Sequence, residues 1–202
     1  MRYLLISICL CLVGCASYTK KHGFKEIETI DKVVYNPYFS DVSKDYVYKA
    51  KIEFYNKKFG GIFIVKKIAE SNHRVVFTTE MGSKIFDFSF NNDDFKVNYI
   101  LEEMDKNILL NILEKDFRVL VREYGNILNK SVKENRTLLE TEIVNKKYFY
   151  TFKNDQLNSI SRVKMGKEKV QFIFSDISAI TAKNIQILHH NIKLTIKLKS
   201  IN

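Results

Sequence analysis

The sequence is poor in the residues that interrupt regular structure. Its 202 residues include one proline and seven glycines, and it has no tryptophan. Flexible linkers and glycine-rich phosphate-binding loops need proline or glycine, so we do not expect a nucleotide-binding fold. The composition, 46% hydrophobic and 28% charged, suits one compact domain. Fifteen phenylalanines and eleven tyrosines supply bulky apolar surface for a core or an apolar pocket.

Groups for covalent catalysis and metal binding are also scarce. The chain has four histidines and no Gly-x-Ser-x-Gly, His-Glu-x-x-His or Cys-x-x-Cys motif. His189 and His190 are adjacent in a predicted strand, where successive side chains point to opposite faces and cannot easily share a metal. Acidic pairs such as Glu102-Glu103 are explained by solvation at turns. We expect no catalytic residue, metal site or cofactor, and a carboxylate pair of the glycosidase type stays open as an alternative.

The first fifteen residues have the layout of a bacterial secretion signal. Arg2 gives a basic start, and Leu4–Val13 is almost wholly apolar and too short to span a bilayer. A glycine and then Cys15 end the segment, and this arrangement resembles the lipobox, in which the peptide is cut before an acylated cysteine. We expect a signal peptide over residues 1–14 and lipidation of Cys15. The alternative is an ordinary cleaved signal or a poor membrane anchor.

Removal of the signal changes the cysteine count and the charge. Cys9 and Cys11 leave with the signal and Cys15 is acylated, so no thiol remains for a disulfide. Loss of Arg2 from 33 basic side chains leaves 32 against 23 acidic ones, a net charge of +9 that favours an anionic partner. The resemblance to lipoproteins implies outer-membrane sorting, because Ala16 stands where an inner-membrane retention signal has aspartate. We therefore expect a lipid-anchored domain on the periplasmic face of the outer membrane, with a tether over residues 15–25.

Lysines at alternating positions indicate where the positive charge lies. This pattern is typical of the solvated faces of strands, and attraction to lipid headgroups is a second interpretation. We do not expect nucleic-acid binding. The lysines concerned are Lys49, Lys51, Lys193, Lys197 and Lys199.

The periodicity of the apolar residues predicts a mainly β domain over residues 26–202. Alternation with a period of two predicts strands at 46–54, 59–68, 74–79, 84–90, 95–101, 138–143, 147–152, 158–164, 169–174 and 192–198. Between 104 and 124 the period shifts toward 3.6, which predicts an amphipathic helix inserted after the fifth strand. Segment 24–45 is ambiguous, and we expect a short helix there. The total is about ten strands and one helical region.

The order of these segments resembles the LolA/LolB family. The resemblance is carried by Tyr48–Tyr55, Phe59–Ile68, the passage from Val75–Thr79 into Met81-Gly82-Ser83, and Phe86–Phe90. The segments 159–165, 170–174 and 192–198 follow in corresponding order. The resemblance implies an unclosed, curved antiparallel β-barrel of about ten strands covered by amphipathic helices.

The resemblance also implies a function. A receptor of the LolB type takes acylated lipoproteins from a LolA-like periplasmic carrier into an apolar cavity and releases them into the outer membrane. Met81 and Gly82 occupy the place of the family's membrane-inserting loop, although methionine replaces the usual leucine and Glu80 the frequent proline. The alternative is an envelope lipoprotein that uses the same fold as a binding or scaffold module without lipid transfer. We expect a monomer, because tethered transfer modules work as monomers.

Acyl chains carry no hydrogen-bonding groups, so a cavity for them needs apolar area and adaptable side chains. The side chains on the apolar faces of the predicted strands and helix are candidates for the lining, and the alternative is that they fill the core. The candidates are Ile52, Phe54, Phe63, Phe86, Phe88, Val97, Tyr99, Phe172 and Ile196 on strands, with Leu109, Leu113 and Phe117 on the helical cover.

Overall fold

A computed structural model describes residues 17–201 of the chain. The expected signal peptide and Cys15 lie outside the described residues. The two described helices are α2 (Tyr18–Lys21) and α3 (Asn107–Val121). The strands are β1 (Lys25–Ile27), β2 (Val33–Tyr35), β3 (Asp45–Phe54), β4 (Lys57–Ala69), β5 (Asn72–Thr78), β6 (Lys84–Asn91), β7 (Asp94–Ile100), β8 (Tyr124–Lys133), β9 (Arg136–Ile143), β10 (Lys146–Lys153), β11 (Gln156–Lys164), β12 (Lys167–Ser178), β13 (Thr181–His189) and β14 (Leu194–Ser200).

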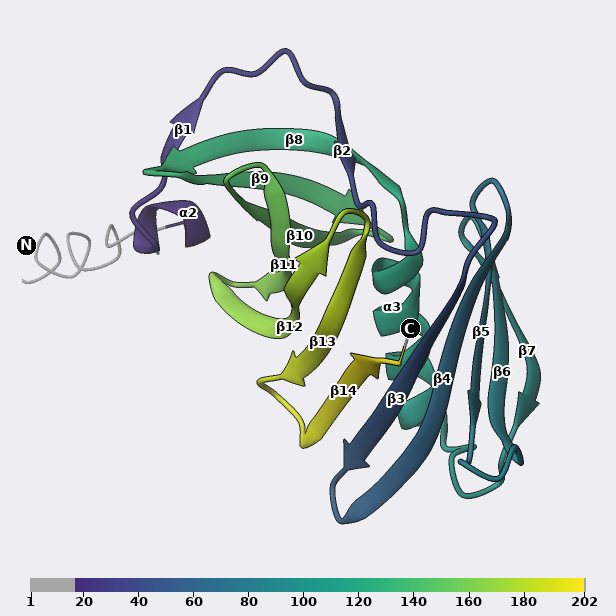
Figure 1. The fold of residues 1–202 in the computed structure, drawn as a ribbon. Coiled ribbons are helices and arrows are strands. Elements are labelled where there is room, and N and C mark those ends of the chain that lie inside the picture. Colours follow the sequence, from purple (N-terminus) through teal and green to yellow (C-terminus); the bar gives the residue numbers. More distant parts are fainter. Residues whose placement is uncertain (1–16, 202) are drawn as a thin grey trace, which may run out of the picture.

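The strands form one antiparallel sheet that does not close. The order is β1-β8-β9-β10-β11-β12-β13-β14-β3-β4-β5-β6-β7, and β2 also pairs with β8. The last strand, β14, pairs with β3 and so joins the two halves of the chain. The sheet curves around α3, which lies on its concave side (Figure 1). The predicted fold class, mainly β with an inserted helix and an unclosed antiparallel barrel, is confirmed.

The sequence-based count of strands was too low. The first five predicted strands correspond to β3–β7, but residues 17–201 contain fourteen strands, because β1, β2 and β8 were missed and β13 was predicted only around His189. Segment 24–45 contains β1 and β2 and no helix. β8 escaped prediction because most of its side chains are exposed or half-buried, so its burial does not follow a clear period of two. Within residues 17–201 a single long helix, α3, covers the sheet, where several were expected.

The expected tether is partly ordered against the sheet. Ser17 caps α2 by accepting from the backbone N–H of Lys20, and the Tyr18 ring lies 4.7 Å from the ring of Phe149. The Tyr18 hydroxyl donates to Glu168 over 2.5 Å. Part of the segment expected to hold the domain away from the membrane is therefore docked on the outer face of the sheet.

The core lies between the concave face of the sheet and α3. Alternate residues in the middle of β3, β4 and β5 point inward and are buried, and Phe86, Phe88 and Phe90 of β6 continue this inner face. The Phe117 ring of α3 lies 5.1 Å from that of Phe63 and 5.6 Å from that of Phe86. The rings of Phe86 and Phe88 stack at 4.5 Å. Aromatic contacts between helix and sheet therefore hold α3 in place.

The segment between β2 and β3, residues 36–44, closes one end of the core, and we call it the strap. The Asn36 side-chain amide donates to the backbone carbonyls of Leu120 and Arg122, over 3.1 and 3.2 Å, and so caps the end of α3. Tyr38 is buried and its hydroxyl donates to the carbonyl of Leu157 over 2.5 Å. The strap therefore connects the helix to both halves of the sheet.

Gly61 allows a close approach between two parts of the chain. A Cβ atom at this position would lie 1.8 Å from the carbonyl oxygen of Thr78. Any side chain at position 61 would therefore displace the end of β5 and the loop that follows it. This loop carries Met81.

Candidate functional site

The helix α3 is anchored unevenly. From Asp116 to Val121 every residue is buried, whereas Ile108 near the start of the helix is 70% exposed. The first turn has no acidic residue, and the N-cap residue Lys106 makes no side-chain hydrogen bond to it. Two usual stabilisers of a helix N-terminus are therefore missing. The first half of α3 is the less firmly held part of the cover.

Most of the predicted cavity residues meet in one cluster beneath α3. Phe54 and Val97 are half-buried against this cluster. In this arrangement the apolar side chains contact one another and fill the concave side. The buried members are Ile52, Phe63, Phe86, Phe88, Leu109, Leu113, Phe117, Phe172 and Ile196.

The structure contradicts the placement of Tyr99 in the cavity. The register between β6 and β7 shifts between Asp87 and Phe88, so Tyr99 pairs with Asp87 while Val97 pairs with Phe88. The shift leaves Asn98 unpaired and turns Tyr99 to the outer face, where Lys84 Nζ lies 5.9 Å from its ring centroid. A bulge is not visible in the alternation of residue types, which is why the prediction was wrong.

Partly exposed basic side chains surround the buried Asp87 on that outer face. Arg74 donates to both carboxylate oxygens of Asp87, over 2.9 and 2.7 Å, and Lys84 Nζ lies 2.8 Å from Oδ2. Hydrogen bonds from Arg74, which outweigh the effect of desolvation, hold the pKa of Asp87 well below its usual range. These contacts connect β5 to β6. Both oxygens of the Asp87 carboxylate have partners, so the cluster is a structural feature.

A buried contact between a histidine and an aspartate connects α3 to the sheet. His189 Nε2 at the end of β13 lies 2.7 Å from Oδ2 of Asp116, and both side chains are almost fully buried. Burial raises the pKa of Asp116, while the hydrogen bond from His189 and the charge of Arg162 act in the opposite direction. The sequence carried a signal for this contact, because Asp116 follows Leu113 and precedes Phe117 on the apolar arc. This contact agrees with the structural or surface role predicted for His189.

The loop expected to insert into membranes is exposed at its tip. Met81 is 93% exposed, and the turn is closed by hydrogen bonds between the backbone of Thr79 and those of Gly82 and Ser83. Gly82 has a φ of 87°, a conformation that favours glycine. Glu80 beside the tip forms an ion pair of 2.9 Å with Lys49. The loop therefore presents one large apolar side chain to solvent.

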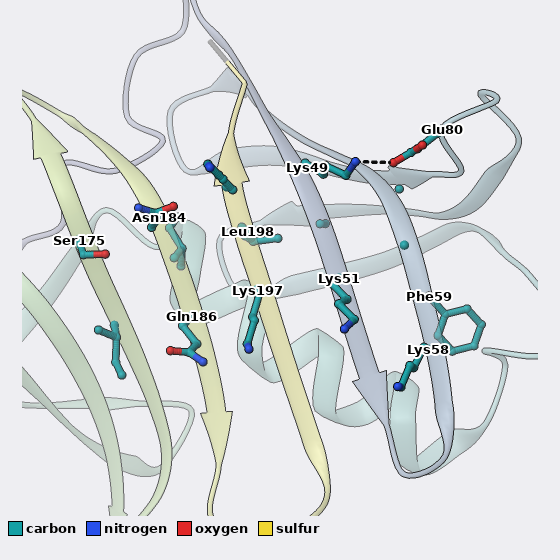
Figure 2. Close-up of a pocket in the computed structure, with 16 residues that line it drawn as sticks. Lys49, Lys51, Lys58, Phe59, Glu80, Ser175, Asn184, Gln186, Lys197 and Leu198 are labelled. Atoms are coloured by element: carbon teal, nitrogen blue, oxygen red, sulfur yellow. Dashed lines mark ion pairs between the residues drawn. The ribbon is translucent and has the colours of Figure 1, made fainter.

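Four of the alternating lysines, all except Lys193, line a depression of about 620 Å³ on the outer face (Figure 2). Lys49 and Lys199 pair in register, as do Lys51 and Lys197 in the next row of that face. Figure 2 shows the side chains of Lys51, Lys58 and Lys197 reaching outward from three neighbouring strands. All of them are exposed, as predicted for the solvated face of a strand.

Within residues 17–201 no three histidine, cysteine or acidic side chains gather in a group that could hold a metal ion. Over the same residues no helix is long and apolar enough to cross a membrane.

Comparison with known proteins supports the fold assignment. No family model and no curated protein matches this sequence. The structure is similar to a crystal structure of a LolA superfamily protein from Nitrosomonas europaea, with a TM-score of 0.53 and 8% sequence identity. The match covers 83% of this chain and 88% of the other. The chain therefore has the LolA superfamily fold.

Proposed function

We propose that this protein is a lipoprotein anchored to the outer membrane by Cys15 and facing the periplasm. It binds acyl chains on its concave face, receives lipoproteins from a LolA-like carrier and inserts them into the outer membrane, as a receptor of the LolB type does. It performs no bond chemistry and needs no cofactor. The LolA superfamily fold supports this proposal, since an open sheet with an apolar inner face provides apolar area without directed polar contacts.

The uneven anchoring of α3 is the observation that carries the proposal. An acyl chain reaches the concave face only when α3 moves, because Leu113 and Phe117 are fully buried against the sheet. The half of α3 that contains Ile108 is the less firmly held half. Its displacement withdraws Leu109 and Leu113 from the buried cluster, and the acyl chain then takes their place. The helix and the acyl chain therefore compete for one surface.

The filled core favours a second candidate function. If α3 never leaves the sheet, the same fold serves as a binding or scaffold module in the envelope without lipid transfer. Contacts such as those of Phe117 with Phe63 and Phe86 support this alternative. The two functions differ in one property, the uptake of acyl chains.

A substitution that loosens α3 distinguishes the two functions. Leu113→Ala leaves a cavity under the helix and is expected to lower the free energy of unfolding by about 2–5 kcal/mol. Under the proposed function it also raises the affinity for a dansylated fatty-acyl probe, because less packing must be broken to admit the chain. Ile108→Ala, on the exposed side of the same helix, is the matched control. Probe fluorescence and thermal unfolding of residues 16–202 are the measurements.

Each outcome decides between the functions. Uptake by the natural sequence that is stronger in Leu113→Ala and unchanged in Ile108→Ala supports displacement of α3. Absence of uptake in all three proteins, with Leu113→Ala still folded, refutes acyl binding and supports the scaffold function.

A further inference from the structure

The two ends of the sheet differ in the residues at which the chain reverses. The antiparallel order places the turns after β3, β5, β9 and β11 at one end, which we call the apolar rim. These turns carry Tyr55, Met81, Val144 and Met165, and all four side chains are exposed. The turn after β13 lies at the same end and is the exception, because it holds the exposed polar residues His190, Asn191 and Lys193. Met165 is 88% exposed.

The opposite end, which we call the polar rim, has different turns. The chain reverses there at Ser71, Asn92, Asn135 and Asn154 after β4, β6, β8 and β10. The turn after β12, at Ala179, is the exception. Polar residues are usual at exposed turns, so the apolar rim is the end that needs an explanation.

Val144 shows the difference most clearly. It has a φ of 47° at the turn between β9 and β10. A β-branched residue is rarely found in this left-handed region, where asparagine, aspartate or glycine is usual. Met165 occupies the corresponding position before Gly166 in the turn between β11 and β12. Both turns therefore hold a large apolar side chain in solvent where local conformation favours a small or polar one.

The first described residues lie on the outer face of the sheet, with their N-terminal end directed toward the apolar rim. Tyr18 contacts Phe149 in the middle of β10 and Glu168 near the start of β12, beside the turn of Met165. At the other end of α2, the carbonyl of His22 accepts from Lys133 at the polar rim. Figure 1 shows α2 next to this part of the sheet. The sixteen residues before Ser17 include the apolar segment 4–13. A membrane attachment made through those residues therefore joins the domain beside the turn of Met165.

Lysines flank the turns of Val144 and Met165. Lys146, Lys164 and Lys167 are exposed, and Lys164 pairs in register with Lys167, an arrangement of like charges that is unfavourable by itself. Lys146, Lys164 and Met165 line a depression of about 800 Å³. Among the nearby acids, Glu168 accepts from Tyr18 and Glu140 pairs with Lys147, and the exposed Glu142 lies opposite Lys147 in the register of β9 and β10. The surface is therefore positively charged around its apolar tips.

We propose that Val144 and Met165, with Lys146, Lys164 and Lys167, form a bilayer-docking face that rests on an anionic membrane surface. The two apolar side chains enter the headgroup layer, and the lysines contact lipid phosphates. This inference rests on the proposed function only for a membrane attachment before Ser17, and it does not require acyl-chain binding. It also turns the apolar rim, with Met81 and the exposed start of α3, toward the membrane.

Because the chain has no natural tryptophan, single tryptophans report membrane contact without background. The test uses the full chain reconstituted into vesicles of phosphatidylcholine and phosphatidylglycerol that contain a nitroxide-labelled quencher lipid. Met165→Trp and Val144→Trp are compared with Val42→Trp, because Val42 and Val144 are both 57% exposed and Val42 lies in the loop before β3, at the polar rim. We expect blue-shifted emission and loss of most of the intensity at 165 and 144, and neither change at 42.

A charge variant tests the role of the lysines in the Met165→Trp background. Replacement of Lys146, Lys164 and Lys167 by glutamine is expected to restore most of the emission when phosphatidylglycerol is present. The matched control replaces Lys44, Lys153 and Lys183 at the polar rim, which lowers the net charge equally and leaves the quenching unchanged. High salt is expected to act like the first variant.

Two results overturn the docking face. One is full emission from Met165→Trp in the anionic vesicles, and the other is equal quenching at Val42→Trp. If Val144→Trp lowers the melting temperature, the test rests on Met165→Trp alone. A tryptophan at position 165 disturbs no packing, because that side chain is already highly exposed. Failure of acyl uptake leaves this quenching pattern unchanged, so the two proposals fail separately.

Discussion

At the scale of single residues, exposure separates side chains that stabilise the fold from side chains available to a partner. Phe63, Phe86 and Phe117 are fully buried and contact one another, so their first role is packing. Met81 contributes little to packing, because almost all of its side chain faces solvent. A functional effect of changing Met81 is therefore separable from an effect on folding.

The Met81 tip gives a residue-scale prediction. In the proposed function Met81→Glu slows delivery of an acylated peptide from the loaded protein to vesicles by roughly tenfold or more, because a charge opposes entry into the apolar layer. Uptake of the acyl probe and the melting temperature stay unchanged. Delivery is measured by the fluorescence energy transfer that develops between the labelled peptide and a labelled vesicle lipid. Val42→Glu is the control, and equal transfer by the two variants contradicts the role of the loop.

At the scale of elements, a more stable start of α3 would hinder the opening of this helix that the proposed acyl-chain binding requires. Lys106 at the N-cap has an extended backbone, with φ of −114° and ψ of 121°, which suits a capping side chain. Lysine cannot accept from the free backbone N–H groups of the first turn, and its charge opposes the helix dipole. Stronger capping of its N-terminus would keep α3 packed on the concave face of the sheet.

Lys106→Asp tests this expectation. It is expected to raise the free energy of unfolding by about 0.5–2 kcal/mol through a new cap. If α3 must open for acyl chains, the same change slows uptake of the dansylated probe. Lys106→Ala, which removes the charge without adding an acceptor, is the control. Stopped-flow fluorescence measures uptake, and a stabilised Lys106→Asp protein with unchanged uptake contradicts opening at this end.

At the scale of the whole molecule, the sheet stays open and the strap after β2 holds the arrangement together. The two free sides of the sheet are β7 and the region of β1, β2 and β8, and within residues 17–201 no strand pairing joins these two sides. Asn36 compensates in part, since it connects β2 to the last turn of α3 and also accepts from the backbone N–H of Tyr38 over 3.1 Å. The firm half of α3 is therefore held by the strap as well as by the sheet.

Asn36→Ala is the corresponding prediction. A buried polar group left without a partner costs about 1–3 kcal/mol, and this change removes the partner of three backbone groups. We expect a loss of at least roughly 2 kcal/mol in denaturant unfolding, with faster amide exchange at the end of α3. Asn135→Ala, on an exposed turn, is expected to stay within about 0.5 kcal/mol of the natural protein. Similar stability of the two variants shows that the strap is not a support.

The amino-acid sequence by itself determined the strands with one buried face and the helix between them. Alternation at β3–β7 and a period near 3.6 in α3 are local patterns, and each follows from which side of an element meets the core. The resemblance to the LolA/LolB family rested on their order, and the structural match confirms the fold at 8% identity. Met81 at an exposed tip followed from the same order.

Only the tertiary structure decided the features that depend on register and on contacts distant in sequence. The bulge near Asn98 moved Tyr99 to the outer face, and the polar strand β8 is stabilised by its neighbours rather than by its own pattern. The pairing of His189 with Asp116 joins residues 73 positions apart. The common position of Val144 and Met165 at one rim follows from the strand order of the sheet. Such contacts arise from chain packing, which no window of residue types encodes.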